Sequence, residues 1–239
     1  MSCAAPSQRS SQRRNIIGKL YKTDKPELSI IGTNSRQGKF SLQLYLRKEL
    51  MKRGFAVGNM GTEPSSLLFG FDTVFPCGYN GQIQLDIPQT ITAVNELIWD
   101  ITQKDPDIII TGGQSGFLAY NDSNARMFPS YHQIVFSAIQ LDAIILCINP
   151  YDDTDFIERT IKAAEGLSNG KVIGIVCFPI DASEGWRGRM GAKKRITEQQ
   201  ESELKNRLLH RFDYNIGIYM LDSSLEIDAL IEAIIHYFQ

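Results

Sequence analysis

A glycine-rich segment that ends in a lysine is the part of this sequence best suited to bind an anion. Residues 32–39 read Gly-Thr-Asn-Ser-Arg-Gln-Gly-Lys, between an apolar run at 28–32 and a segment whose leucines stand four residues apart. Backbone N–H groups in such a turn, together with the positive end of the following helix, hold phosphate oxygens, and a lysine adds positive charge. We therefore expect a phosphate-binding loop whose ligand contacts come from Gly32, Thr33, Asn34, Ser35, Arg36, Gln37, Gly38, Lys39, Phe40 and Ser41.

The loop departs from the usual phosphate-loop pattern in two ways. Five residues separate its glycines instead of four, and Phe40 stands where a serine or threonine normally binds Mg²⁺. Ser41 comes one position later, so we expect it to be the metal ligand from this segment. The alternative interpretation is an ordinary turn between a strand and a helix, with Lys39 exposed.

Polar residues also follow two other predicted strands. Glu63 follows the strand at 55–59, and Gln114 and Ser115 follow the strand at 107–111. Ligands of open α/β sheets bind where the strands end, so these side chains are candidates for the same site. We expect Lys39, Glu63 and Gln114 to be catalytic, Glu63 also to bind metal, and Ser115 to contact the cofactor. A solvated loop carboxylate is the alternative for Glu63, and Asp72 is a weaker acidic candidate.

Two later segments carry charge near predicted strand ends. Asp152 and Asp153 follow the strand at 143–149, where we expect a helix N-cap rather than a catalytic acid. Residues 184–195 contain five basic residues and three glycines. Because arginine binds anions through two parallel hydrogen bonds, Arg187 and Arg189 are predicted to hold the cofactor's phosphates from a lid. The alternative is a solvated basic loop.

The elements that would position these residues alternate between strand and helix. Runs such as Ile108-Ile109-Ile110 and Ile144-Ile145-Leu146 are apolar on both faces, which is typical of parallel strands covered by helices on both sides. The pattern predicts an α/β fold with a doubly wound, mostly parallel sheet of about six strands. Those strands are expected at 28–32, 55–59, 107–111, 143–149, 171–178 and 216–221. Helices are expected at 37–53, 88–102, 129–140, 153–167, 197–210 and from about 227 to the end.

Composition limits the class of function. A net charge of −2 gives no electrostatic reason to expect nucleic acid as a partner, and no apolar run is long enough to span a bilayer. The three histidines lack metal-ligand spacing. Four cysteines (Cys3, Cys77, Cys147 and Cys177) match no zinc pattern and are expected to be reduced, mostly buried thiols, which is typical of a cytoplasmic protein.

The order of these motifs resembles the C-terminal P-loop domain of the uncharacterised family that includes D-glutamate N-acetyltransferase. The segment from Gly32-Thr33 to Ser41 is similar to that family's loop, where a residue without a hydroxyl follows the lysine, and dethiobiotin synthetase shares the five-residue spacing. Further similar segments follow in order at 58–62, 113–116, 129–131 and 142–143. The resemblance spans about residues 27–180 and is nearest to small P-loop proteins of peptide-maturation systems.

Two differences from the family affect the domain and its chemistry. Gly112 stands where the family has an acid, which puts ordinary nucleotide hydrolysis in doubt. Only 26 residues precede the first strand, whereas family members usually carry an N-terminal domain. We interpret 1–26 as a flexible arm or the remnant of a missing domain, and 27–239 as one P-loop α/β domain.

The resemblance implies three functions. The first is an enzyme that uses ATP with Mg²⁺ to activate a carboxylate of an amino acid or peptide, in natural-product peptide maturation. The second is an N-acyltransferase that holds the phosphates of acetyl-CoA on the loop. The third is a non-catalytic nucleotide-binding partner in a maturation complex. The expected partners are a small-molecule or peptide substrate, a second copy in a homodimer and proteins of a biosynthetic system, without nucleic acid or membrane.

Overall fold

The computed structural model describes residues 20–75, 86–119, 130–181, 194–212, 216–221 and 224–239. Several sequence-based predictions lie outside these residues. They concern the arm up to residue 19, Cys3, Cys77, Arg187 and Arg189.

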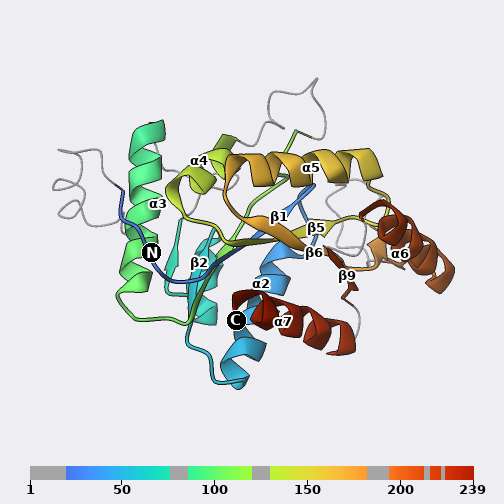
Figure 1. Ribbon diagram of the computed structural model, residues 1–239, viewed down its shortest axis with the longest axis horizontal. Helices are drawn as coiled ribbons and strands as arrows, with labels where there is room; N and C mark the ends of the chain where they lie inside the picture. The colour runs from blue at the N-terminus through green and yellow to red at the C-terminus, as the bar shows by residue number, and fades with distance from the viewer. Residues whose placement is uncertain (1–19, 76–85, 120–129, 182–193, 213–215, 222–223) are drawn as a thin grey trace.

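A parallel sheet forms the centre of the molecule (Figure 1). Its seven strands lie in the order β3-β2-β4-β1-β5-β6-β9, and every neighbouring pair is parallel. The strands are β1 (Glu27–Gly32), β2 (Val57–Gly61), β3 (Thr73–Val74), β4 (Ile108–Gly112), β5 (Ala143–Ile148), β6 (Lys171–Cys177) and β9 (Gly217–Met220). A short antiparallel pair, β7 (Ile180–Asp181) and β8 (Lys194–Arg195), lies outside the sheet.

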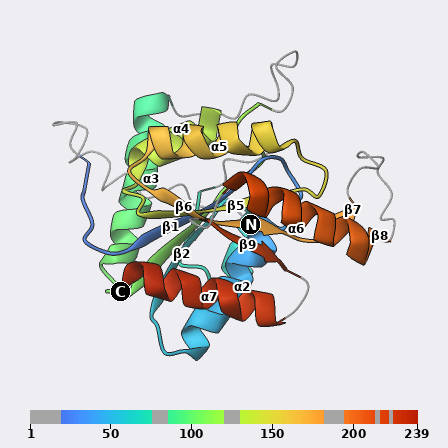
Figure 2. The same cartoon turned by 45° about the vertical axis from the view of Figure 1, so that its right-hand side comes forward.

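Helices cover both faces of this sheet, as Figures 1 and 2 show. Leucines of α2 and apolar residues of α7 pack on one face, and α3, α4, α5 and α6 pack on the other. All six residues of β1 and of β5 are buried, which explains why β5 is apolar on both faces. The helices are α2 (Lys39–Lys52), α3 (Ile87–Thr102), α4 (Ser130–Ala138), α5 (Thr154–Leu167), α6 (Glu198–Phe212) and α7 (Ser224–Phe238), with a 3₁₀ helix η1 at Pro64–Phe69.

The predicted doubly wound α/β fold is confirmed, and the sheet has one more strand than the six expected. The added strand, β3, is a two-residue edge strand beside Met60 and Gly61. Such a short strand has no periodic pattern, so the sequence did not indicate it. α2 begins at Lys39 rather than at residue 37, because Gly38 has a left-handed φ of 80° that is incompatible with a helix.

Other predictions concern the cysteines and the chain start. Cys147 and Cys177 are free and buried, as expected.

The described part of the predicted arm contacts α3: the Tyr21 backbone N–H donates to Oδ1 of Asn95 (2.8 Å), and the Tyr21 ring stacks on Trp99 at 4.4 Å. In the part of the chain that the structure describes, no helix has the length and apolarity needed to cross a membrane.

Candidate functional site

The glycine-rich segment connects the central strand β1 to α2, at the carboxyl edge of the sheet. Neighbouring strand ends fix it on both sides, because the Thr33 N–H donates to the Cys147 carbonyl (3.1 Å) and the Phe117 N–H donates to the Gly32 carbonyl (2.7 Å). Arg36 and Gly38 both have positive φ, at 62° and 80°. A Cβ at position 38 would overlap the Phe178 ring, so only glycine fits there.

Lys39 is almost completely enclosed at the start of α2. Its side chain is 7% exposed, and Nζ donates to the Asn34 carbonyl at 2.6 Å. Burial lowers the pKa of Lys39 to about 8, because a charged amine loses its hydration there. The structure therefore excludes the exposed lysine of the alternative interpretation. An anion bound at this position would favour the charged form.

Gln37 and Asp152 form a buried polar network beneath the loop. Nε2 of Gln37 donates to the Thr33 hydroxyl and to Oδ2 of Asp152 (3.2 Å), and the Thr33 hydroxyl donates to that same Oδ2. Oε1 of Gln37 accepts from the Asn34 N–H at 2.9 Å. Gln37 is 3% exposed and Asp152 is 4% exposed, so these bonds are shielded from water and hold the loop against the end of β5.

Asp152 and Asp153 therefore have different roles. Asp153 is the N-cap of α5, as expected for one of the two: its Oδ1 accepts from the N–H groups of Asp155 and Phe156. Asp152 instead accepts from the Asn149 N–H (2.8 Å) as well as from Thr33 and Gln37. Two adjacent aspartates cannot be distinguished by sequence pattern, because only the path of the chain after β5 decides which carboxylate points inward.

Phe40 replaces the usual metal-binding hydroxyl with an aromatic contact. Its ring lies 5.8 Å from that of Phe69 at the end of η1 and 5.9 Å from that of Phe71. Glu63 is the N-cap residue of η1. The contacts of Phe40 therefore pack η1, which follows Glu63, against the start of α2. Ser41 is exposed on α2. The structure thus gives Phe40 a packing role and leaves the hydroxyl of Ser41 accessible to solvent.

Glu63 and Gln114 meet at the edge of the sheet, as predicted from their strand ends. Nε2 of Gln114 donates to Oε1 of Glu63 at 3.2 Å, and both side chains are accessible to solvent. The turn that contains Gln114 and Ser115 lies beside the loop, since a Cβ on Gly116 would stand 2.5 Å from the Thr33 carbonyl oxygen. Ser115 itself has a positive φ of 57°.

His132 of α4 contacts the backbone of the turn that contains Gln114 and Ser115. It is buried, its Nε2 contacts the Gln114 carbonyl, and burial together with the charge of Lys39 lowers its pKa to about 3. The ring is therefore neutral at physiological pH and donates from Nε2. No sequence pattern indicated a role for this histidine, since its contact with residue 114 depends on how α4 packs.

Gln43 explains why a glycine occupies the position of the family's acid. Its Nε2 donates to the carbonyls of Met60 (3.0 Å) and Ile110 (3.1 Å), which joins the ends of β2 and β4. A Cβ on Gly112 would overlap Oε1 of Gln43. An acidic side chain at 112 would therefore require Gln43 to move.

The weaker acidic candidate, Asp72, has structural contacts instead. Its two carboxylate oxygens accept from the Asn59 N–H (2.8 Å) and from Lys104 (2.7 Å). In the described part of the chain, no three His, Cys, Asp or Glu side chains are grouped to hold a metal ion. A Mg²⁺ ion that keeps several waters and binds phosphate oxygens needs only one or two protein ligands, so this finding does not test the prediction that Glu63 and Ser41 bind metal.

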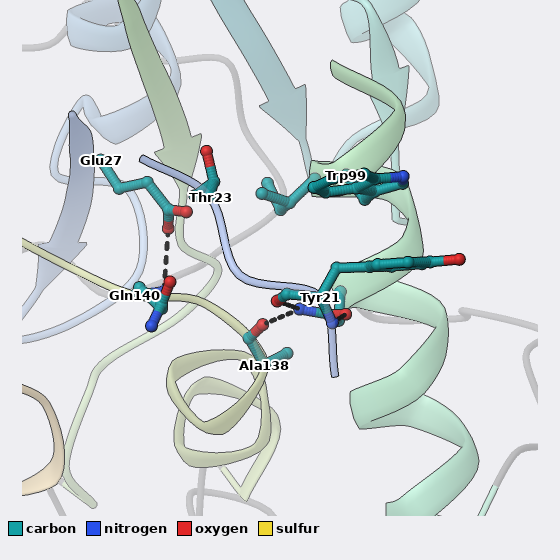
Figure 3. A pocket seen from close by; sticks show the side chains of 8 residues that line it. Tyr21, Thr23, Glu27, Trp99, Ala138 and Gln140 are labelled. Atoms are coloured by element: carbon teal, nitrogen blue, oxygen red, sulfur yellow. Dashed lines mark hydrogen bonds between the residues drawn. The ribbon is translucent and has the colours of Figure 1, made fainter. Parts of the chain in front are cut away.

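A separate cavity lies at the opposite, amino edge of the sheet (Figure 3). Its volume is about 10 Å³, enough for one water molecule, and it is lined by Tyr21, Glu27 and Trp99 among others. Oε2 of Glu27 accepts from the Gln140 N–H (3.0 Å), and burial raises the pKa of Glu27 to about 8. This cavity is not part of the loop site.

The fold and the loop define a P-loop α/β domain. A family profile described as "Domain of unknown function (DUF1611_C) P-loop domain" matches residues 14–176. The chain belongs to this family. No curated protein matches the sequence.

Three solved structures share the fold at low sequence identity. A DUF1611 family protein from Anabaena variabilis is 15% identical with a TM-score of 0.63; the alignment covers 91% of this chain, which spans only 61% of that protein. Cobyrinic acid a,c-diamide synthase from Mycobacterium smegmatis, solved with ADP and magnesium, is 9% identical (TM-score 0.54, 90% and 95% covered). A nucleotide-binding protein from Archaeoglobus fulgidus, in complex with ADP, is 14% identical (TM-score 0.51, 96% and 93% covered).

Proposed function

We propose that this domain binds ATP with Mg²⁺ and uses it to activate a carboxylate of an amino acid or peptide. The observation that carries the proposal is the meeting of Glu63 and Gln114 at 3.2 Å on the carboxyl edge that also presents the loop. Lys39 and the loop N–H groups would bind the phosphates, while the Glu63–Gln114 pair remains free for the metal and the second substrate. The fold shared with an ADP- and magnesium-bound a,c-diamide synthase also supports this choice.

The reaction is a phosphoryl transfer followed by acyl transfer. A carboxylate oxygen of the substrate attacks the γ-phosphorus, the bond to the β,γ-bridging oxygen breaks, and ADP leaves with that electron pair. An amine then attacks the acyl carbon, the bond from that carbon to the phosphate oxygen breaks, and phosphate leaves with the electron pair. The nitrogen loses a proton to the departing phosphate or to solvent, and an amide remains. Such chemistry depends mainly on positioning and on neutralising charge.

Each of these residues has a role in the two reaction steps. The ammonium of Lys39 neutralises charge on the transferred phosphoryl group. Glu63 binds Mg²⁺, which would neutralise the phosphates, and Gln114 donates its amide N–H to the carboxylate of the substrate. Gln114 can turn from Glu63 to a substrate at small cost, because their hydrogen bond is exposed to water.

Ligand binding is the first test. Thermal unfolding is measured with ATP–Mg²⁺, GTP–Mg²⁺ and acetyl-CoA, since a ligand raises the unfolding temperature in proportion to the logarithm of its concentration over Kd. We expect ATP–Mg²⁺ to stabilise the wild type clearly more than Lys39→Met. Stabilisation by acetyl-CoA alone would support the N-acyltransferase and reject the ATP proposal.

Trapping of the acyl phosphate is the second test. Hydroxylamine converts an acyl phosphate to a hydroxamate and releases phosphate, so mixtures of amino acids or peptides are screened for hydroxamate that depends on ATP. We expect Glu63→Gln to lower this signal strongly and Glu203→Gln, a change on the exposed side of α6, to leave it unchanged. ATP binding without hydroxamate from any mixture would favour a non-catalytic binding partner.

A further inference from the structure

The interior of the phosphate loop is filled by the loop's own side chains. A Cβ placed on Gly32 would overlap Oε1 of Gln37 and would lie 3.0 Å from Nζ of Lys39 and 3.2 Å from the Asn34 carbonyl oxygen. These three groups therefore share the space directly above Gly32. Gln37 and Lys39 are 3% and 7% exposed, so solvent scarcely reaches this space.

The groups that should bind phosphate are engaged with one another there. The Asn34 N–H donates to Oε1 of Gln37 (2.9 Å), and Nζ of Lys39 donates to the Asn34 carbonyl (2.6 Å). A phosphate oxygen can accept from the Asn34 N–H only after Oε1 of Gln37 has left it. It can pair closely with Lys39 only after Nζ has turned away from the carbonyl.

Asp152 holds the other end of the Gln37 carboxamide. Nε2 of Gln37 donates to Oδ2 of Asp152 (3.2 Å) and to the Thr33 hydroxyl. When Gln37 leaves, Asp152 still accepts from Thr33 and from the Asn149 N–H (2.8 Å). The buried carboxylate thus keeps two donors, so Gln37 can move without leaving it unpaired.

We propose that the Gln37 side chain is a built-in competitor for the phosphate position and that Gln37 thereby sets the affinity of the loop for phosphate ligands. This rests on the proposed function in so far as the loop binds a nucleotide. Because several contacts must be broken at once, a ligand with several linked phosphates displaces Gln37, whereas a single inorganic phosphate does not.

The test compares ligand affinity between variants by isothermal titration calorimetry, with ADP–Mg²⁺ and inorganic phosphate as probes. Gln37→Ala removes the competing amide, so we expect it to bind ADP about threefold to tenfold more tightly than the wild type. We also expect phosphate binding to become measurable. Gln103→Ala, the same change at the exposed end of α3 near the amino edge of the sheet, serves as the matched control with wild-type affinity. Equal or weaker ADP binding by Gln37→Ala would overturn the proposal, since Gln37 would then be inert or a ligand contact.

A second measurement uses the wild-type protein and does not depend on the variant folding. The Asn34 backbone amide and the Gln37 side-chain amide are followed by ¹⁵N NMR during titration with ADP–Mg²⁺. Displacement predicts that both signals shift, while the side-chain amide of Gln103 stays in place. An unshifted Gln37 amide at saturation contradicts displacement.

Lys39→Met separates failure of this inference from failure of the proposed function. If ADP binds the wild type and Lys39→Met equally or binds neither, the loop is not the nucleotide site and both proposals are wrong. If Lys39→Met alone loses binding while Gln37→Ala gains none, only the role given to Gln37 is wrong.

Discussion

The Thr33 hydroxyl donates a hydrogen bond to the Asp152 carboxylate, across 119 residues of sequence and between the ends of the adjacent strands β1 and β5. This buried contact fixes the phosphate loop to the next strand end. The contact also distinguishes two neighbouring acids. Asp152 accepts this hydrogen bond, whereas Asp153 caps α5.

Asp152→Ala is expected to destabilise the protein more than Asp153→Ala. Removing the inner carboxylate leaves the buried Thr33 hydroxyl and the Asn149 N–H without this acceptor and takes one of two acceptors from Nε2 of Gln37, at a cost of about 2–4 kcal/mol. Loss of the N-cap costs about 1 kcal/mol. Urea unfolding of both variants measures the difference, and equal destabilisation would contradict the role given to Asp152.

Lys39→Met is expected to weaken ADP–Mg²⁺ binding by about tenfold to a hundredfold, because a charge-assisted hydrogen bond to phosphate is lost. Lys48→Met, at an exposed position of the same helix, is the matched control. Calorimetric titration gives both affinities. A wild-type Kd for the position-39 variant would mean that the loop is not the nucleotide site.

Nucleotide binding is expected to take up protons near pH 8. The pKa of Lys39 is about 8 in the ligand-free protein, so about half of the side chains are neutral at that pH, and a bound phosphate holds the amine charged. Binding enthalpies in buffers of different ionisation enthalpy should indicate uptake of about half a proton at pH 8 and almost none at pH 6. The pH 8 uptake should vanish in Lys39→Met; if it persists there, another group is responsible.

Gly112→Ala is expected to cost about 1–3 kcal/mol of unfolding free energy, because its Cβ would overlap the Gln43 carboxamide that bridges β2 and β4. The control is Gly166→Ala in α5, where no atom lies within 4 Å of the added Cβ. That change should stabilise the helix by up to about 1 kcal/mol. Denaturant unfolding distinguishes the two, and a neutral Gly112→Ala would show that Gln43 does not exclude a side chain.

Glu27→Gln is expected to remove a pH dependence of stability. The folded-state pKa of Glu27 is about 8 against an ordinary 4.5, so the folded protein holds a proton that the unfolded chain releases. The stability that this gives is complete below about pH 4.5 and is lost as the pH rises through 8. Relative to Glu27→Gln, the wild type should lose about 1.4 kcal/mol per pH unit within that window. Urea unfolding at pH 5, 6 and 7 measures the slope, and parallel curves for the two proteins would reject the prediction.

Sequence patterns determined the parts of this protein that depend on local order along the chain. The apolar runs of β4 and β5 predicted a covered parallel sheet, because strands buried on both faces carry no polar alternation. The glycines and lysine of 32–39 placed a loop between a strand and a helix, and the strand ends brought Glu63 and Gln114 to one edge.

Only the tertiary structure decided which side chains fill the site. Asp152 approaches the site from the turn before α5, His132 from α4 and Gln43 from α2. Their partners include residues distant in sequence and backbone carbonyls, which every residue has and which the sequence does not distinguish. The packing role of Phe40 likewise depends on Phe69 and Phe71, which the folded chain places beside it. The composition of residues 32–39 predicted a phosphate-binding loop. The groups that occupy the loop's interior depend instead on packing between strands and helices, which no local pattern encodes.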